Sequence, residues 1–272
     1  MTVSVNDAVI QAATNGILTS ASLMVAGPAC ADAVARAHAT PRLAVGLHLV
    51  VIEGTPTLPP DQIPDLVDAH GRFPSDQLRL GIRYYFSPRV RRQLAAEIRA
   101  QFEAFRATGL KLDHANAHKH MHLHPTVGRM MIGIGREFGL RAVRVPAEYP
   151  IKGGPPMRFG DQILRRWSSV LRAQVREAEM ITSDRVLGLG WTGHMNPTRT
   201  QILLDNLPAG LTEMYFHPAV RRDMELMKLM PDYEHEAEFT ALHSCTLPKD
   251  VELCSYSPPG PVFLSSHAGS PE

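Results

Sequence analysis

The feature that most constrains the fold is a regular alternation of short apolar segments with amphipathic helical segments. About seven segments have the length and composition of buried strands. They lie at residues 20–27, 43–51, 110–115, 141–145, 185–190, 211–218 and 251–257. The segments between them place apolar residues at helical spacing, and one begins with the N-cap and first-turn pair Ser87-Pro88. Such alternation predicts a parallel sheet whose strands are connected by crossover helices.

Polar residues follow several of these strands at their C-terminal ends. His48 lies near the end of 43–51, a histidine-rich segment follows 110–115, and His217 lies near the end of 211–218. Because (β/α) barrel enzymes assemble their sites at this end of the strands, we predict an α/β fold of the (β/α) barrel type. An open doubly wound sheet is the alternative. The first helical segment, residues 4–15, has no strand before it, which is an unusual start for an α/β protein.

Composition excludes several classes of protein. The 28 basic and 27 acidic side chains give a net charge of +1, whereas nucleic-acid-binding domains usually carry a basic excess. The three cysteines form no disulfide scaffold and match no CxxC pattern, which favours a reducing, cytoplasmic location. No apolar run approaches the ~20 residues of a membrane span. We expect one domain over residues 1–257 and a disordered tail over 258–272.

The most unusual feature is the density of histidine. Residues 113–125, DHANAHKHMHLHP, contain His114, His118, His120, His122 and His124. In an extended segment the last four would share one face, and in a helix the first, second and fourth would stack at one-turn spacing. Neutral imidazole is the commonest metal ligand near neutral pH, and it suits Zn²⁺ unless carboxylates or water join it. Since an open metal site uses about three protein ligands, some of these histidines must have other roles.

Four residues elsewhere each have two interpretations. His48 is either a core histidine with satisfied hydrogen bonds or a ligand facing the histidine-rich segment. His217 is either a core residue or a general acid or base. Arg144 lies in an apolar strand, so it must pair with a carboxylate or point into the site. Glu53 is either a loop residue or a site carboxylate. Nucleotide-binding and GxSxG motifs are absent from the sequence, which favours hydrolysis by metal-activated water.

Five segments taken together resemble a known family. They are VNDAVIQAATNGILTSASLMVAGPA, VGLHLVVIEG, LDHANAHKHMHLHP, RAVRVPAE and EMYFHPA. In this order they resemble the YdjC-like (ChbG-like) carbohydrate deacetylases, and within them the hopanoid-biosynthesis-associated (HpnK-like) branch. The similarity runs from about Val3 to Glu238.

The resemblance implies a (β/α) barrel of the glycoside hydrolase/deacetylase type that removes N-acetyl groups from amino sugars. The branch implies an N-acetylglucosaminyl hopanoid as substrate, which is compatible with peripheral membrane contact and with a homodimer. One divalent ion, Mg²⁺ or Zn²⁺, would be held by an Asp together with His48 and His118. His217 would be the catalytic acid and Arg144 a substrate-binding residue. Three further histidines would support the ligands through hydrogen bonds: His114, His120 and His122.

Two departures from the family pattern affect this interpretation. Many relatives have Asp where this sequence has Asn116. Relatives also carry an ADDFG motif on a first strand, in which one Asp binds the metal and the other is the general base. We therefore expect either a natural protein that starts upstream of Met1, or an N-terminally truncated, inactive metal- or sugar-binding relative. Loss of the base would cost roughly 10²–10⁴-fold in rate.

A third interpretation is another metal hydrolase, such as an amidohydrolase-like phosphoesterase. It would need further carboxylates at strand ends, for which Asp113 and Asp184 are the available residues.

Overall fold

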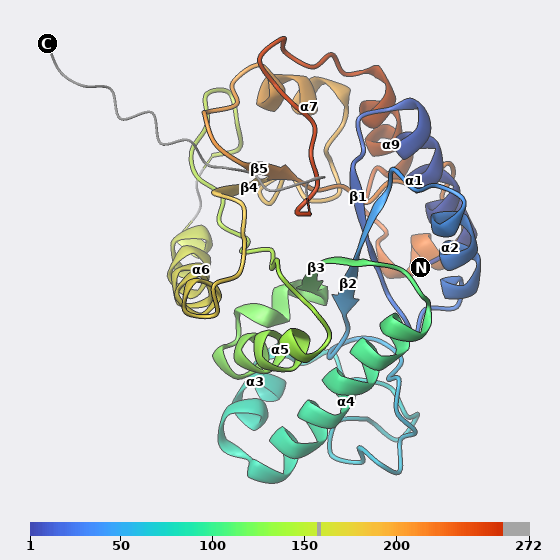
Figure 1. Ribbon diagram of the computed structural model, residues 1–272, viewed down its shortest axis with the longest axis vertical. Coiled ribbons are helices and arrows are strands. Elements are labelled where there is room, and N and C mark those ends of the chain that lie inside the picture. Colours follow the sequence, from blue (N-terminus) through green and yellow to red (C-terminus); the bar gives the residue numbers. More distant parts are fainter. Residues whose placement is uncertain (157–158, 258–272) are drawn as a thin grey trace, which may run out of the picture.

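A computed structural model describes residues 1–156 and 159–257 (Figure 1). Strands alternate with helices along the chain, so the predicted α/β class is confirmed. The elements in order are α1 (Val3–Asn15), β1 (Ser20–Leu23), α2 (Cys30–His38), β2 (Ala44–Leu49), α3 (Gln77–Phe86), α4 (Pro88–Ala107), β3 (Leu112–Ala117), the 3₁₀ turn η1 (His118–Leu123), α5 (Pro125–Glu137), α6 (Phe159–Glu177), β4 (Arg185–Leu187), α7 (Pro197–Leu204), β5 (Thr212–Met214), α8 (Met224–Leu229) and α9 (His235–Ser244).

The strands form two small parallel sheets. One has the order β1-β2-β3 and the other pairs β4 with β5. The segment between them connects the two sheets. Ala142 and Val143 make parallel bridges to Ile181 and Ala115, and Val186 N donates to the Ala147 carbonyl at 3.0 Å. Within the described residues β1 and β5 do not pair. This part of the chain is therefore open between these two strands, as a barrel without its first strand would be, and the barrel stays a prediction.

Local signals explain where the long helix α4 begins and ends. The Ser87 hydroxyl accepts a hydrogen bond from Val90 N, and Pro88 occupies the first turn. The helix ends before Gly109, whose φ of +74° suits glycine. Its apolar stripe is buried against the sheet and α5, where truncating one large side chain would cost about 2–5 kcal/mol. The stripe consists of Leu94, Ile98, Phe102 and Phe105.

The two sheets rest on cores of different size. The larger core lies around β1, β2 and β3 and extends to α4 and α5. The smaller one has three buried members, Leu187, Met195 and Leu203, under β4 and α7. Figure 1 shows α3, α4 and α5 gathered below β2 and β3, with α7 near β4 and β5. The β1–β3 side of the molecule is therefore the more firmly packed of the two.

Several sequence predictions need correction at this level. Residues 251–257 form no strand, because this segment uses its polar groups on other elements: Ser257 N donates to Asp113, and Tyr256 OH donates to Glu213. Residues 141–145 form only isolated bridges. The helices α3 and α8 were not predicted. The single domain over 1–257 stays a prediction, and the predicted tail, 258–272, lies outside the described residues.

In the parts of the chain that the structure covers, none of the helices combines the length and apolar character that crossing a bilayer requires.

Candidate functional site

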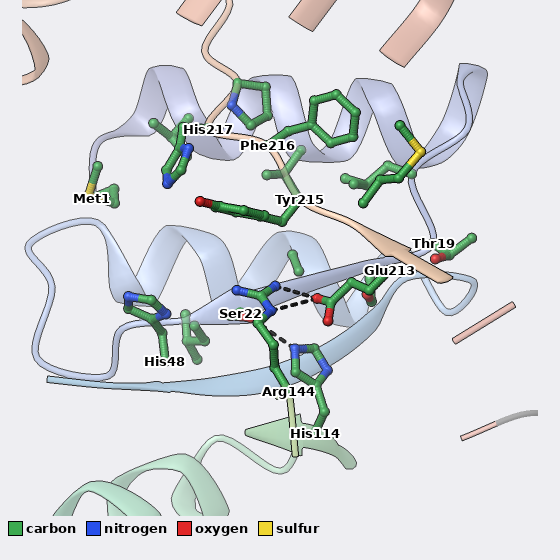
Figure 2. A pocket seen from close by; sticks show the side chains of 18 of the residues that line it. Met1, Thr19, Ser22, His48, His114, Arg144, Glu213, Tyr215, Phe216 and His217 are labelled. Carbon is green, nitrogen blue, oxygen red and sulfur yellow. Dashed lines mark hydrogen bonds and ion pairs between the residues drawn. The ribbon is translucent and has the colours of Figure 1, made fainter. Parts of the chain in front are cut away.

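A cavity of about 1920 Å³ lies between β1 and β5, and the strand ends supply its polar lining (Figure 2). Alternate residues of a strand point to the same side, so each strand contributes side chains from one face. Glu213, Tyr215 and His217 reach the cavity in this way from β5 and the residues after it, and Ser22 does so from β1. Figure 2 shows Tyr215 and His217 on the opposite side of the opening from His48, and Ser22 on the same side as His48.

His48 and His118 come from neighbouring strands and meet at the cavity. His48 is on β2, and His118 is the first residue after β3. Their ring centres are 5.8 Å apart at an interplanar angle of 70°. Two imidazoles bound to one ion at about 2.0–2.1 Å have ring centres about 5–6 Å apart, so the pair fits two ligands of one ion.

The protonation state of this pair also suits metal binding. Burial lowers the pKa of both imidazoles, and for His48 the neighbouring His118 lowers it further. Both rings are therefore neutral at pH 7, which is the form that binds metal. Over residues 1–156 and 159–257, however, no group of three or more His, Cys, Asp or Glu side chains is arranged to hold an ion. The described residues thus bring together two imidazoles, one fewer than such a group requires.

The histidine-rich segment is divided between two elements, so neither of the two geometries considered from the sequence describes all of it. Residues up to Ala117, His114 included, belong to β3, and His118–Leu123 form the 3₁₀ element η1, in which Lys119 and His120 have positive φ angles of 49° and 54°. A left-handed conformation costs roughly 1–2 kcal/mol per non-glycine residue, so surrounding contacts must hold it. One such contact is the ion pair at 2.5 Å between Lys119 and Glu53, which also lines the cavity.

This turn directs the histidines to different places. His118 meets His48, whereas the ring centre of His120 lies 6.1 Å from that of Tyr215. His122 is fully buried, and its Nε2 donates to the Arg144 carbonyl at 3.0 Å. Burial lowers the pKa of His120 to about 4 and that of His122 well below its ordinary value. His122 therefore supports the backbone of Arg144, and its predicted support of a metal ligand stays untested.

A buried network of hydrogen bonds connects Asp113 to His48. The His114 ring lies between Asp113 and Ser22, with Nδ1 2.8 Å from Asp113 Oδ2 and Nε2 2.9 Å from Ser22 Oγ. Asn116 donates from Nδ2 to Ser22 Oγ at 2.8 Å, and its Oδ1 lies 2.6 Å from His48 Nδ1. We call these five side chains the Asp113–His48 network. Neither Ser22 nor Asn116 was predicted from the sequence to take part in such a network.

Arg144 forms a buried ion pair with Glu213. Its Nε lies 2.7 Å from Glu213 Oε1, its Nη2 bonds to the same oxygen, and Tyr256 OH donates to the other carboxylate oxygen. Burial disfavours the charged form of both side chains, but the attraction and hydrogen bonds between them are stronger together. The pKa of Arg144 is therefore raised and that of Glu213 is lowered. The guanidinium also lies 5.2 Å from the ring centre of Tyr215. The pairing expected of an arginine in an apolar strand is confirmed, and substrate contact stays a prediction.

Glu213 was missed in the sequence, although a signal for it exists. Residues 213, 215 and 217 alternate with Met214 and Phe216, and this period places the polar set on one face.

His217 lies deep in the cavity wall between two tyrosine rings. Its ring centre is 5.3 Å from Tyr215 and 5.1 Å from Tyr233. Its backbone N–H donates to Glu238, and its carbonyl accepts from His235 Nδ1 at 2.6 Å. Burial and then the Arg144 charge lower the pKa of His217 to about 3. The imidazole is therefore neutral at pH 7, and it must gain a proton during a reaction before it can act as a charged acid.

Two further observations concern buried polar groups around the cavity. The Nδ1 atoms of His120 and His217 are buried without a hydrogen-bond partner among the described residues, and such atoms usually face water, an ion or a ligand. Glu238, also missed in the sequence, is fully buried and accepts from Met195 N at 3.1 Å as well as from His217 N. Burial raises its pKa to about 7.

Comparison with known proteins gives consistent results. The family described as YdjC-like protein matches residues 1–252. A carbohydrate deacetylase of Brevibacillus brevis is 35% identical over 62% of this chain and 61% of its own length. One of Oceanobacillus iheyensis is 33% identical over 55% of this chain and 60% of its own length. The chain thus spans about three fifths of the length of these curated relatives.

A solved structure shares the fold. It is that of a protein described as a cellobiose-phosphate cleavage protein of Enterococcus faecalis V583, with a TM-score of 0.69 and 23% sequence identity. The match covers 89% of this chain and 86% of that one.

Proposed function

Since this chain belongs to the YdjC-like protein family, we propose that it is a carbohydrate deacetylase, which hydrolyses the N-acetyl group of an amino sugar. The names of the relatives support the activity, and the cavity supports a sugar-sized substrate. The observation that carries the proposal is the His48–His118 pair, two neutral imidazoles from separate elements whose ring centres lie 5.8 Å apart beside the cavity.

We propose that His48 and His118 hold one divalent ion. Imidazole ligands favour Zn²⁺, whereas Mg²⁺ prefers oxygen ligands, so Zn²⁺ fits this pair better. When bound, the ion would polarise the amide carbonyl and lower the pKa of a water molecule. A carboxylate remains to be supplied, and we propose that it comes from a strand outside this sequence that lies between β1 and β5. Within the described residues β1 and β5 each pair with a strand on one side only, and both line the cavity, which supports this position.

Proton transfer and substrate binding would be carried out by residues of this chain. Water oxygen adds to the acetyl carbon, the C–N bond breaks, and the products are acetate and a free amine. His217 is neutral beforehand, so it receives the proton released by the attacking water, directly or through a carboxylate, and passes it to the leaving nitrogen. Arg144, held by Glu213, would contact the substrate through guanidinium N–H groups left free by the ion pair.

Finer parts of this proposal rest on the family resemblance alone. They are the N-acetylglucosaminyl hopanoid as substrate, contact with a membrane surface, and a homodimer.

A second function is favoured by the two-ligand site. A relative that binds metal or sugar without turnover needs the cavity and the imidazole pair, but not a third ligand or a base.

One experiment separates the two functions. Acetate release from N-acetylglucosamine oligomers is measured for the chain as given and for the protein extended by its upstream codons, with and without EDTA. Chelator-sensitive release from the extended protein, lost in His48→Gln, supports a deacetylase. Sugar binding by calorimetry without acetate release from either protein would replace the enzyme with the binding function.

A further inference from the structure

The Asp113–His48 network points to a role for two residues that the proposed function does not use. We propose that Ser22 and Asn116 are positioning residues that hold His48 in the Nδ1–H tautomer, so that its Nε2 lone pair faces the cavity. The inference rests on the proposed function only where it takes that lone pair to bind metal. The tautomer itself follows from the hydrogen-bond network.

Asp113 anchors the network because an ionised carboxylate can only accept hydrogen bonds. Its Oδ1 accepts from Ser257 N at 2.8 Å, and its Oδ2 lies 2.8 Å from His114 Nδ1. Asp113 and His114 are 2% and 1% exposed, so water does not compete for these groups. His114 therefore carries a hydrogen on Nδ1, and in the proposed network its Nε2 presents a lone pair to Ser22.

Ser22 links the donor and acceptor roles of His114 and Asn116, because its hydroxyl has a single proton to donate. The proton is donated to His114 Nε2 at 2.9 Å, so the oxygen is left to accept from Asn116 Nδ2 at 2.8 Å. If the Asn116 amide were reversed, the one Ser22 proton would have to serve two acceptors, His114 Nε2 and Asn116 Oδ1. The network therefore selects one orientation of the Asn116 amide.

The orientation of the Asn116 amide then determines which ring nitrogen of His48 carries the hydrogen. Its Oδ1 lies 2.6 Å from His48 Nδ1, and a carbonyl oxygen can only accept, so that nitrogen must carry the hydrogen. His48 Nε2 has no hydrogen-bond partner within residues 1–156 and 159–257, and the His48 ring lines the cavity beside His118. Metal-binding histidines commonly use the other ring N–H in this way, which fixes their orientation.

Gly46 makes the network possible. The strand β2 lies between β1 and β3, and Gly46 is the residue that pairs with Ser22. A Cβ at Gly46 would lie 2.6 Å from both Cε1 and Nδ1 of the His114 ring. Because Gly46 has no side chain, it leaves the space through which His114, on β3, reaches Ser22, on β1.

The tautomer is measured directly by ¹⁵N–¹H correlation of ring-labelled histidine in the metal-free protein. A His48→Gln variant identifies the His48 signals among the 13 histidines. We expect His48 to carry its hydrogen on Nδ1, and His114 to be neutral with its hydrogen also on Nδ1. A His48 ring protonated on Nε2, or a doubly protonated His114, would overturn the inference.

Two serines on the same face of β1 provide a matched pair of variants. Ser22→Ala removes the donor to His114, so His48 should become a mixture of tautomers. Ser20→Ala removes a hydroxyl that also lines the cavity but does not belong to the network, and it should leave His48 unchanged. An unchanged His48 in Ser22→Ala would contradict the proposal.

Asn116 offers a rescue test that does not depend on Ser22→Ala folding. In Asn116→Asp the carboxylate still accepts from His48 Nδ1–H, so the tautomer should persist. Asn116→Leu has a similar size but no acceptor, and the preference should be lost. Loss of the Nδ1–H form in both variants, or its retention in both, would show that Asn116 acts only through packing.

Zn²⁺ alone is the second probe. It should perturb the Nε2 signal of His48 and leave Nδ1 protonated, and Ser22→Ala should weaken Zn²⁺ binding about 10–100-fold while Ser20→Ala does not. Zn²⁺ bound at Nδ1 would refute the positioning role. Because the tautomer is measured without substrate, an Nδ1–H His48 in a protein that releases no acetate would reject the proposed function and leave this inference standing.

Discussion

The two sides of the cavity organise their polar residues by different means. On the β1–β3 side, hydrogen bonds lead from the carboxylate of Asp113 through His114, Ser22 and Asn116 to His48. On the β5 side, Arg144 and Glu213 form a buried ion pair, and burial together with the Arg144 charge lowers the pKa of His217. Hydrogen bonds between side chains thus orient the lone pair of one imidazole, whereas a nearby fixed charge disfavours protonation of the other.

The largest expected effect is on activity and separates the two sides. In the extended protein, His217→Gln should lower kcat by roughly 10²–10⁴-fold while Zn²⁺ affinity is unchanged, because His217 handles a proton and does not bind the ion. His48→Gln should instead lose Zn²⁺ binding. Steady-state acetate release and calorimetric Zn²⁺ titration measure both, and a His217→Gln variant with lost Zn²⁺ affinity would merge the two sides into one.

Breaking the ion pair should be the most costly change to stability. Glu213→Gln keeps the shape but leaves the Arg144 charge buried without its partner, so we expect about 3–5 kcal/mol of lost unfolding free energy in urea titrations. The control is Glu53→Gln at the cavity rim, where the pair with Lys119 is half-exposed and should contribute less than about 1 kcal/mol. Equal costs at the two positions would refute the contrast.

On the β1–β3 side, one added methyl group at Gly46 should destabilise the fold. In Gly46→Ala the new Cβ would lie 2.5 Å from the His114 carbonyl oxygen and 2.6 Å from its ring, so His114 or β2 must shift. We expect a loss of about 1–3 kcal/mol, read from urea titrations. Gly133→Ala in α5 is the control, because its added Cβ meets no atom within 4 Å. That variant should gain up to about 1 kcal/mol from helix propensity.

A smaller effect should appear in the pH dependence of stability on the β5 side. The folded pKa of Glu238 is raised to about 7, so the stability it confers is complete below its ordinary pKa of 4.5 and is lost as pH rises through 7. Glu238→Gln should remove this decline, worth roughly 3 kcal/mol.

The His217 contribution has the opposite sign. Its pKa is lowered to about 3, so its stability is present above pH 6.5 and lost on acidification. Unfolding free energies of the wild type, Glu238→Gln and His217→Gln from pH 3 to 8 would separate the two. A wild type and Glu238→Gln with parallel curves between pH 4.5 and 7 would contradict the first assignment.

Much of the local structure was predictable because short-range chemistry determines it. The predicted helix at 197–204 has those bounds, since Asn196 caps it and Pro197 suits its first turn. The predicted strand at 43–51 became β2 over Ala44–Leu49, because its apolar residues are buried on the core side. Strands at the ends of the open sheet were predicted too long, since a strand persists only where a neighbour accepts its hydrogen bonds.

The amino-acid sequence by itself determined which residues alternate on each strand, where most helices begin, and that His48, His118 and His217 follow strands. The tertiary structure alone places His118 beside His48 and lets two left-handed residues, Lys119 and His120, follow it, and no periodicity in the sequence signals either feature. Only it joined Ser22 to His114 across 92 positions and Arg144 to Glu213 across 69. Such contacts depend on how distant strands meet around the cavity, and local propensity carries no information about that.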